Sequence, residues 1–330
     1  MMERRLRFLS GRDVAKALPM RVAVEAMKEA FRQMSAGEAV VPPRIYIAVE
    51  SPPGDAVFMP AYIPATRRMG LKIITLFGDN VARGLPRIQA LVIVLDAATG
   101  SPLAVMDGTS LTAIRTGAAS GAATDLLARP DATVAALFGA GPQAQTQLEA
   151  VCVVRPIRRA MIFDPSAGRA EALARQMAPR LGIAVLAARS PAEALAGADI
   201  VCTATTSVEP VFADRNVAPG THINAIGSYK PTVREIPAET VRRARVVVDH
   251  RPAALAEAGD LIIPMEQGLI EKDHVYAELG EIVAGLKKGR ESPEQITLFK
   301  SVGVAVQDIA AANLVLAVAE RLNLGTDLTL

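Results

Sequence analysis

The feature that most constrains this fold is a glycine turn that directly follows an apolar segment in the middle of the chain. Residues 132–144 read Ala-Thr-Val-Ala-Ala-Leu-Phe-Gly-Ala-Gly-Pro-Gln-Ala, which predicts a short buried strand followed by a helix. Gly139 permits a tight turn, Gly141 lets the backbone approach a pyrophosphate, and Ala144 allows close helix-on-strand packing. Because a helix N-terminus attracts phosphate, the segment predicts a dinucleotide-binding β-α-β unit.

The next predicted strand, over residues 159–163, ends at Asp164. A carboxylate at this point can accept hydrogen bonds from the adenosine ribose of a bound dinucleotide. Asp164 favours NAD(H), because its charge repels the 2′-phosphate of NADP(H). Arg159 and Arg169 lie close by in the sequence and either could bind that phosphate, so NADP(H) remains an alternative.

The composition is typical of a globular protein with about two domains. The chain has 330 residues, against roughly 150 for an average domain, and its 51% hydrophobic content can fill two cores. A net charge of +2, interspersed charges and the absence of tryptophan argue against a nucleic-acid partner. The chain shows neither a signal peptide nor an apolar run near the ~18 residues of a membrane span. We therefore expect a cytoplasmic protein without nucleic-acid or membrane partners.

Strands alternate with helices in the second half of the chain. Strands are predicted over residues 134–138, 159–163, 184–186, 200–203, 222–226 and 245–249, and helices over residues 143–153, 167–177 and 191–195. This alternation predicts a parallel sheet of the Rossmann type, covered by helices.

The first part of the chain follows a different pattern. One helix is predicted over residues 12–35, followed by extended segments at residues 44–50, 71–77, 88–95 and 102–106, with a hairpin turn at 96–100. This part should be α+β with antiparallel pairing. A helix rich in small residues, 109–127, leads into the cofactor domain, and a last helix, 302–322, returns to the first domain. The expected boundaries are 1–117 with 310–330 for the first domain, and 118–309 for the cofactor domain.

The cysteines and histidines show no pattern of a metal site. Cys152 lies in an apolar helical segment and Cys202 in a predicted strand, so both are interpreted as core residues. His222, His250 and His274 share no ligand spacing, and no bound metal is expected.

Three cationic residues of the first domain stand in otherwise apolar surroundings. Arg44 follows two prolines, Lys72 begins an apolar strand, and Arg115 lies in a helix of small and apolar residues. Arginine can bind a carboxylate with two hydrogen bonds, and a desolvated lysine can exchange a proton. Together they are compatible with a site for a small carboxylic acid. The alternative is three unrelated residues at the surface or in salt bridges.

Six segments, taken in order, make the chain similar to a known family. They are Val41-Pro-Pro-Arg44, Met59-Pro-Ala-Tyr62, Gly70-Leu-Lys72, Leu111-Thr-Ala-Ile-Arg-Thr-Gly-Ala-Ala-Ser120, Gly139-Ala-Gly-Pro-Gln-Ala144 and Phe299-Lys-Ser-Val-Gly303. With them the sequence resembles the ornithine cyclodeaminase and mu-crystallin family over nearly its whole length. The resemblance implies a central Rossmann domain, an α+β domain for substrate binding and dimerisation that the C-terminal helix completes, and a homodimer.

The resemblance also implies roles for individual residues. Arg44, Lys72 and Arg115 match the residues that bind and polarise an amino or imino acid, and Met59, Phe77, Tyr229 and Gly303 complete the expected substrate site. The residues expected to bind the cofactor are Thr116, Gly139, Ala140, Gly141, Pro142, Gln143, Asp164, Thr203, Ala204, Thr205, Ser207, Ile226, Gly227, Ser228, Ser301, Val302 and Gly303.

One departure from the family pattern bears on the direction of the reaction. The family's cyclodeaminases and alanine dehydrogenases carry an aspartate soon after the strand at 222–226, and Tyr229 takes this position here. A tyrosine hydroxyl, with a pKa of about 10, is a poor general base at neutral pH. Oxidation of an ammonium substrate needs such a base, whereas reduction of a protonated imine does not. The resemblance therefore implies NAD(P)H-dependent reduction of a small cyclic imino acid, such as Δ1-pyrroline-2-carboxylate to L-proline.

Two other functions remain open from the sequence. The first is ornithine cyclodeamination or an oxidation like that of alanine dehydrogenase, and the second is a non-catalytic ligand-binding protein like mu-crystallin. Asp308, in the last predicted helix, either faces the substrate domain or lies on the helix surface.

Overall fold

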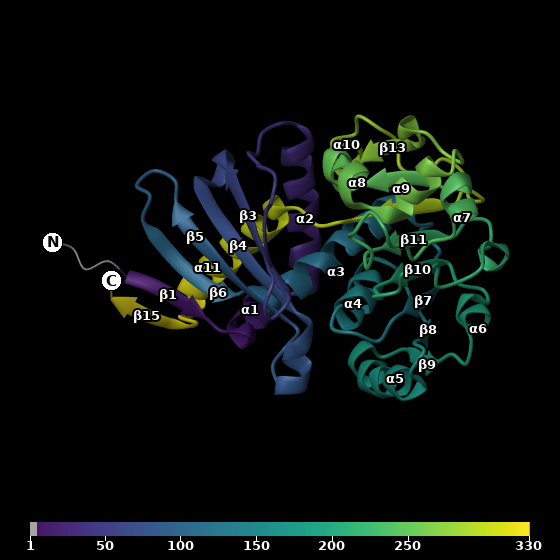
Figure 1. The fold of residues 1–330 in the computed structure, drawn as a ribbon, viewed down its shortest axis with the longest axis horizontal. Coiled ribbons are helices and arrows are strands. Elements are labelled where there is room, and N and C mark those ends of the chain that lie inside the picture. Colours follow the sequence, from purple (N-terminus) through teal and green to yellow (C-terminus); the bar gives the residue numbers. More distant parts are fainter. Residues whose placement is uncertain (1–4, 330) are drawn as a thin grey trace. The chain divides into compact units, whose positions relative to one another are not determined.

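The computed structural model describes residues 5–329, and the chain divides into two compact units. Unit 1 comprises Met1–Arg115 and Val304–Leu330, and unit 2 comprises Thr116–Gly303 (Figure 1). The chain passes from unit 1 to unit 2 after Arg115 and returns after Gly303. The expected boundaries, after residues 117 and 309, lie a few positions later. Asp308, expected at the end of the cofactor domain, therefore belongs to unit 1.

Unit 1 is built on a mixed sheet. Its strands are β1 (Arg5–Leu9), β2 (Ile45–Val49), β3 (Gly54–Ile63), β4 (Arg68–Phe77), β5 (Ile88–Asp96), β6 (Pro102–Asp107) and β15 (Thr326–Thr329). Among residues 5–329 they form a seven-stranded sheet in the order β15-β1-β6-β5-β4-β3-β2. Strands β1 and β6 are parallel, and the other neighbours are antiparallel. The predicted α+β class with antiparallel pairing is confirmed, including the hairpin between β5 and β6.

The helices of unit 1 differ from the prediction at one point. They are α1 (Gly11–Ala17), α2 (Met20–Ser35) and α11 (Ala305–Leu322), with short 3-10 turns η1 (Pro64–Thr66) and η2 (Gly78–Arg83). The single helix predicted over residues 12–35 is wrong, because the chain breaks at Leu18 and Pro19. A proline disfavours helical geometry in the residue before it and has no N–H to donate.

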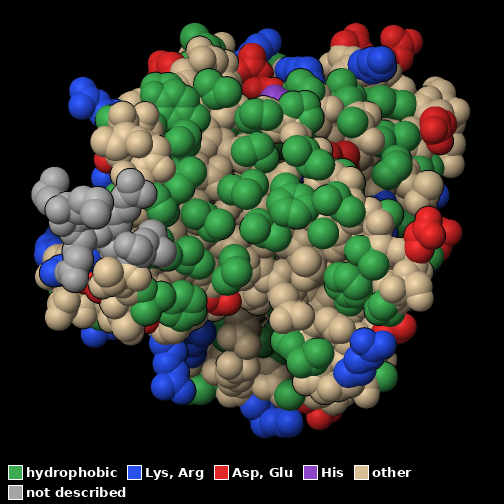
Figure 2. Space-filling view, turned by 60° about the vertical axis from the view of Figure 1, so that its left-hand side comes forward, with side chains coloured by type: hydrophobic (Ala, Val, Ile, Leu, Met, Phe, Trp, Pro, Cys, Tyr) green, Lys and Arg blue, Asp and Glu red, His purple; other side chains and the backbone are tan. Residues whose placement is uncertain are grey.

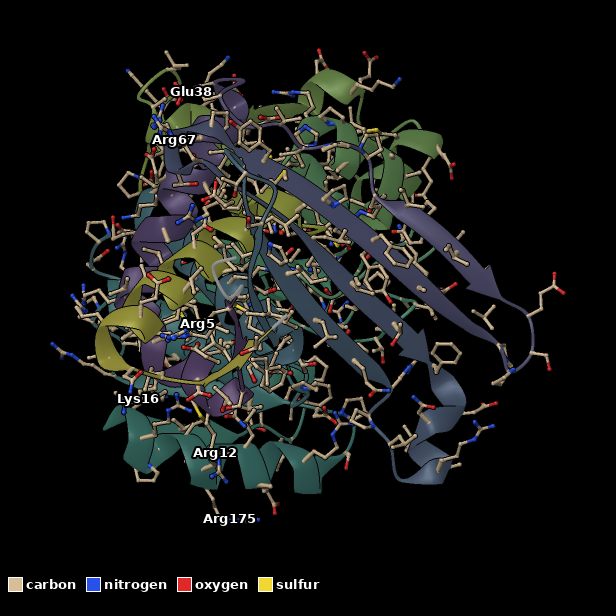
Figure 3. All side chains as sticks on the ribbon, turned by 90° about the vertical axis from the view of Figure 1, so that its left-hand side faces the viewer. Arg5, Arg12, Lys16, Glu38, Arg67 and Arg175 are labelled. Atoms are coloured by element: carbon tan, nitrogen blue, oxygen red, sulfur yellow. The ribbon has the colours of Figure 1, made fainter. Side chains whose placement is uncertain are left out.

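Within residues 5–329, helices cover one face of this sheet and not the other. Met59, Lys72, Val92 and Met106 are cross-strand neighbours on β3 to β6, and all are buried. Helix α11 contacts β3, β4 and β5, and α2 packs against α11. Because side chains alternate between the faces of a strand, Lys72 points to the side that α11 covers. In Figure 3 the long strands of the sheet cross the view diagonally.

Unit 2 is an α/β unit around a parallel sheet. Its strands are β7 (Val134–Phe138), β8 (Arg159–Phe163), β9 (Ala184–Ala187), β10 (Ile200–Thr203), β11 (His222–Ala225), β12 (Arg245–Val248), β13 (Val275–Glu278) and β14 (Thr297–Lys300). Within the described part of the chain they form an eight-stranded sheet, in the order β13-β12-β14-β11-β10-β7-β8-β9, and every pair is parallel. The carboxyl ends of all these strands therefore lie at one edge. The predicted Rossmann-type sheet is confirmed.

The helices of unit 2 follow the strands in alternation. Helix α3 (Gly108–Leu127) begins in unit 1 and enters unit 2, and the others are α4 (Ala144–Val154), α5 (Ala167–Leu181), α6 (Pro191–Leu195), α7 (Ala238–Arg243), α8 (Arg251–Glu257), α9 (Gly259–Glu266) and α10 (Leu279–Val283), with 3-10 turns η3 (Asp214–Asn216) and η4 (Lys272–His274). Central strand β7 is buried on both faces. Leu137 belongs to one apolar cluster and Phe138 to the other, as expected for a covered parallel sheet.

The cysteines and the first histidine are structural. Cys202 is buried in β10 and Cys152 is mostly buried in α4, and burial raises the pKa of each thiol to about 12. His222 is buried on β11 and bonds Thr297 Oγ1 at 2.9 Å, and burial lowers the pKa of its ring to about 3.

No helix within residues 5–329 is both long and apolar enough to cross a membrane. The cytoplasmic location and the lack of a nucleic-acid partner stay predictions.

Candidate active site

The cationic cluster of unit 1 is centred on a buried carboxylate. Asp308, in the first turn of α11, lies 2.9 Å from Lys72 Nζ through Oδ2 and 3.0 Å from Arg115 Nε through Oδ1. Asp308 is fully buried, and Lys72 and Arg115 are only 1% and 6% exposed. The helix-surface alternative for Asp308 is therefore wrong. Because both cations share one carboxylate, a change at any of the three affects the other two.

Gln307 fixes the orientation of the Arg115 guanidinium. Arg115 Nη1 donates to Gln307 Oε1 at 2.9 Å, and the backbone N–H of Val304 donates to the same oxygen at 3.0 Å. Arg115 is thus bonded on two of its nitrogens, Nε and Nη1, to the first turn of α11. A guanidinium held in this way keeps one orientation, which suits recognition of a planar carboxylate.

Positive charge exceeds negative charge around Lys72. Burial and the charge of Arg115 lower the pKa of Lys72 to about 8, although Asp308 acts in the opposite direction. Arg44, which immediately precedes β2, also lowers this pKa through its charge. Within the buried cluster itself, Lys72 and Arg115 share the one carboxylate of Asp308. A buried excess of positive charge favours an anionic ligand.

The other predicted substrate residues divide into two groups. Met59 pairs directly with Lys72 in the β3–β4 register and is buried beside it. Phe77 is not brought to this cluster. It lies an odd number of positions after Lys72 on the same strand, so it faces the opposite side, and it packs against Gly54. Tyr229, which is 38% exposed, and Gly303 belong to unit 2.

The glycine turn of unit 2 has the geometry that the sequence predicts. Gly139 has a φ of +96°, and a Cβ at this position would lie 2.7 Å from the carbonyl oxygen of Ala204. A Cβ at Gly141 would meet only the end of the Arg169 side chain, at 3.8 Å. Gly141 is therefore not required by the protein's own packing. This agrees with a glycine that leaves room for a ligand.

The helix after the turn begins without a side-chain cap. Helix α4 begins at Ala144, and Gln143 at its N-cap makes no side-chain capping bond. Thr146, in the first turn of α4, is approached closely by Gly117, the residue after Thr116 on α3. The uncapped turn and the open space at Gly141 fit a bound pyrophosphate, whereas Pro142 has no N–H to donate. The chain's residues therefore fit a dinucleotide at this edge.

Asp164 links the turn to the next strand. Its carboxylate is buried and accepts the backbone N–H of Ala140 at 2.9 Å and that of Ser166 at 2.9 Å. Arg169 Nη2 lies 3.6 Å from Asp164 Oδ2, so a carboxylate neutralises part of the charge that could attract a 2′-phosphate. Arg159 is an exposed residue at the start of β8, away from the carboxyl edge. This arrangement favours NAD(H).

Five of the predicted hydroxyl residues of unit 2 donate their hydrogens within the protein. Thr203 and Thr205 donate to Glu235, Ser228 to the carbonyl of Val233, Ser301 to Asp249, and Ser207 to the carbonyl of Glu209. Their side chains therefore build the loops at the ends of β10, β11 and β14. The loops also contain Ala204, Ile226 and Gly227, which carry no side-chain donor.

Five residues at the two sites were not predicted from the sequence to act there. Asp249, at the end of β12, accepts the backbone N–H groups of Val302 at 2.9 Å and Gly303 at 2.7 Å. Glu235, Asp260 and Lys300 form a buried charged group below the loops, and Gln307 orients Arg115. A charged residue in an otherwise apolar strand, such as Lys300, is the signal that could have revealed this group.

Within residues 5–329 no cluster of acidic, histidine and cysteine side chains has the arrangement of a metal site.

The chain is similar to known proteins over nearly its whole length. A model of the ornithine cyclodeaminase/mu-crystallin family matches residues 5–322. A Δ1-pyrroline-2-carboxylate reductase of Bacillus cereus is 38% identical over 305 residues, which are 92% of this chain and 94% of that protein.

Two solved structures share the whole fold. The Thermococcus litoralis Δ1-pyrroline-2-carboxylate reductase in complex with NADH and L-proline is 43% identical, with a TM-score of 0.94, and the match covers 97% of this chain and 99% of that one. An archaeal alanine dehydrogenase dimer with bound NAD is 36% identical, with a TM-score of 0.91 and coverage of 98% and 99%. This chain belongs to the ornithine cyclodeaminase/mu-crystallin family.

Proposed function

We propose that the protein reduces a small cyclic imino acid with NADH, forming a cyclic amino acid such as L-proline from Δ1-pyrroline-2-carboxylate. One observation carries the proposal: in the buried cluster of unit 1, Lys72 and Arg115 share the carboxylate of Asp308, so positive charge is in excess. A substrate carboxylate would supply the missing negative charge. The related Bacillus and Thermococcus reductases act on the same class of substrate.

The residues of unit 1 hold the substrate in this proposal. Arg44 and Arg115 bind its carboxylate, and Met59 contacts its apolar ring beside Lys72. Lys72 orients the carboxylate or relays a proton. Bound NADH supplies the hydride that adds to the imine carbon. The nitrogen already carries its proton, so the C=N bond becomes a C–N bond and no further proton is needed at the moment of transfer.

The cofactor residues lie on unit 2 in this proposal. The glycine turn and the N-terminus of α4 bind the pyrophosphate, and Asp164 binds the adenosine ribose. The loops that end at Ser228 and Gly303 contact the nicotinamide. Asp164 and its contact with Arg169 support NAD(H) over NADP(H), and both structural relatives named above contain NADH or NAD.

Oxidation of an open-chain amino acid is the second candidate. The archaeal alanine dehydrogenase has nearly the same fold and a similar identity, which favours this alternative. Tyr229 opposes it, because a phenol is a poor acceptor for the ammonium proton that must leave before hydride transfer.

A substrate panel separates these functions. NADH and NADPH oxidation is followed by the loss of nicotinamide absorbance with cyclic and linear imino acids, and NAD reduction is followed with L-proline, L-alanine and L-ornithine. We expect the largest kcat/KM with a cyclic imino acid and NADH. Turnover of L-alanine or L-ornithine with no imine reduction would instead establish the second candidate. No turnover and no dinucleotide binding would contradict both.

The charge of Lys72 should make ligand binding depend on pH. Tetrahydrofuran-2-carboxylate resembles the product but has no amine, so its own charge is constant from about pH 6 to 10. The charged form of Lys72 attracts this carboxylate and is lost as the pH rises through about 8. We expect the inhibition constant to rise about tenfold per pH unit above that point, because one proton is lost. The Lys72→Arg variant stays charged, and the same measurement should give a constant that does not rise there.

We also infer that the uncovered face of the unit 1 sheet is the homodimer interface. Ile45, Phe58, Ile73 and Leu91 form one cross-strand row on this face, and Ile45 and Leu91 are 58% and 45% exposed. Figure 2 shows hydrophobic side chains gathered on the side that its rotation brings forward. In Figure 3 the labelled charged residues Arg12 and Lys16 lie away from the long strands. The alanine dehydrogenase relative is a dimer.

A charge in this row should separate the protomers. The double variant Ile45→Asp/Leu91→Asp places two carboxylates on an apolar surface that a second copy would bury, which costs several kcal/mol of association free energy, roughly 2–4. Sedimentation velocity should show a monomer for the variant and a dimer for the wild type. Leu286→Asp, at a residue that is 74% exposed in unit 2, is the control and should remain a dimer. A wild-type monomer would refute the inference.

A further inference from the structure

One buried carboxylate joins two of the loops at the carboxyl edge of unit 2. Glu235 Oε1 accepts from Thr205 N and Oγ1, both at 2.7 Å. Its Oε2 accepts from Thr203 Oγ1 at 2.9 Å, Gly227 N at 2.7 Å and Ser228 N at 3.3 Å. Thr203 ends β10 and Thr205 belongs to the loop after it, and Gly227 and Ser228 belong to the loop after β11. These two strands are adjacent in the sheet. Glu235 therefore fixes the distance between these two loops.

A second pair of charges connects Glu235 to a third strand. Asp260 Oδ1 accepts the backbone N–H of Glu235 at 2.7 Å and that of Ile236 at 2.9 Å. Asp260 Oδ2 lies 2.8 Å from Lys300 Nζ, and Lys300, the last residue of β14, also donates to the carbonyl of Ser228. Strand β14 lies next to β11 in the sheet. The three side chains thus link the ends of β10, β11 and β14.

All three charged side chains are fully buried. Glu235, Asp260 and Lys300 have no exposed surface, so solvent cannot replace their hydrogen bonds. Five donors point at the two oxygens of Glu235, two at Oε1 and three at Oε2, so an amide nitrogen in place of either oxygen would remove the acceptor of two or three of them. A buried donor without a partner is costly, and the loops would move to recover the lost bonds.

The residues that bond to Glu235 lie at the strand ends where the nicotinamide half of a dinucleotide would bind. Thr203, Thr205, Gly227 and Ser228 lie at the ends of β10 and β11, whereas the glycine turn and Asp164 follow β7 and β8. In an open parallel sheet a dinucleotide extends across the carboxyl ends of the strands. With the pyrophosphate at β7 and the adenosine at β8, the nicotinamide half extends toward β10, β11 and β14.

We propose that Glu235, supported by Asp260 and Lys300, is a positioning residue for the nicotinamide half of the cofactor. It holds the loops after β10 and β11 at the separation that this half requires and makes no contact with the adenosine half. This inference rests on the proposed NADH-dependent function. Its consequence is that loss of Glu235 affects the two halves of the cofactor unequally.

The Glu235→Gln variant tests this inequality with two ligands. ADP carries the adenosine and pyrophosphate but lacks the nicotinamide, and its dissociation constant can be measured by calorimetry. NADH binding can be followed by the emission of NADH itself, which is simplified because the chain has no tryptophan. We expect NADH to bind about tenfold more weakly and kcat to fall about 100-fold, as for a displaced reacting group, while the dissociation constant of ADP stays unchanged.

Two further variants keep the result interpretable. Asp199, just before β10, accepts the backbone N–H groups of Thr133 at 2.8 Å and Val134 at 3.0 Å at the other edge of the sheet. Asp199→Asn is the matched control and should lower the melting temperature without changing the ratio of NADH to ADP affinity. If Glu235→Gln does not fold, Thr203→Val removes one of the five bonds and should give the same selective loss in smaller measure.

The outcomes separate this inference from the proposed function. Equal weakening of NADH and ADP by Glu235→Gln, or unchanged NADH binding and kcat, overturns the positioning role. An unaltered ratio in a folded Thr203→Val variant overturns it when the first variant is unfolded. Failure of the wild-type protein to bind either ligand would refute the proposed function instead.

Discussion

Replacing Lys72 with methionine is expected to lower kcat/KM for the cyclic imino acid by about 100-fold or more, with NADH binding unchanged. Methionine has a similar length but no charge, so the buried cluster loses one of the cations that attract the substrate carboxylate. Asp308 keeps its bond to Arg115 at 3.0 Å, and the variant should therefore fold. Steady-state kinetics and an NADH titration measure the two effects separately.

Two variants control for the loss of a lysine and for the loss of charge. Lys28 on α2 pairs with Glu25 at 2.8 Å at the surface, and Lys28→Met should leave kcat/KM unchanged. Lys72→Arg keeps the charge but does not release a proton near neutral pH. If it retains the wild-type KM with a low kcat, Lys72 exchanges a proton, whereas recovery of both constants assigns it to binding alone. A folded Lys72→Met protein with wild-type kcat/KM would rule out this cluster as the substrate site.

Elements with a strong local pattern could be predicted closely from the sequence. The predicted β7 has the bounds of the structure, and α4 begins one residue after the prediction. Glycine, proline and apolar periodicity act within a few residues, so they are visible in one sequence. Pro19 is a local signal of the same kind, because a proline disfavours helical geometry in the residue before it, and it ends α1 before α2 begins. Strands β13 and β14 and helices α7 to α10 are short, and they were not predicted as separate elements.

In the candidate site, the charged residues could be predicted from the sequence, but their partners from distant segments could not. Arg44, Lys72 and Arg115 stood out because each is a charge in apolar surroundings, but the carboxylate shared by Lys72 and Arg115 is 193 positions from Arg115. Only the position of α11 on the sheet identifies Asp308 as that partner. Glu235 depends in the same way on contacts between distant segments. Phe77 lies an odd number of positions after Lys72 on one strand, so the alternation of side chains alone indicates that the two residues face opposite sides of the sheet.

The two glycines of the turn should respond differently to alanine. Gly139→Ala forces a side chain onto a φ of +96° and places its Cβ 2.7 Å from the carbonyl of Ala204. Backbone strain of this kind costs about 1–3 kcal/mol of unfolding free energy. Gly141→Ala meets no backbone atom within 4 Å, so its melting temperature without cofactor should equal that of the wild type.

Cofactor binding should nevertheless be weakened by Gly141→Ala, because the added methyl group occupies the space that a pyrophosphate needs. Loss of one hydrogen bond to a charged group, about 1.5–3 kcal/mol, corresponds to roughly 10- to 100-fold in the dissociation constant of NADH. Gly78→Ala, at an open position in unit 1, is the matched control and should change neither stability nor binding. Thermal unfolding without ligand and an NADH titration measure the two quantities. Since the packing of the protein itself does not require Gly141, wild-type affinity in this variant would mean that the turn does not bind the pyrophosphate.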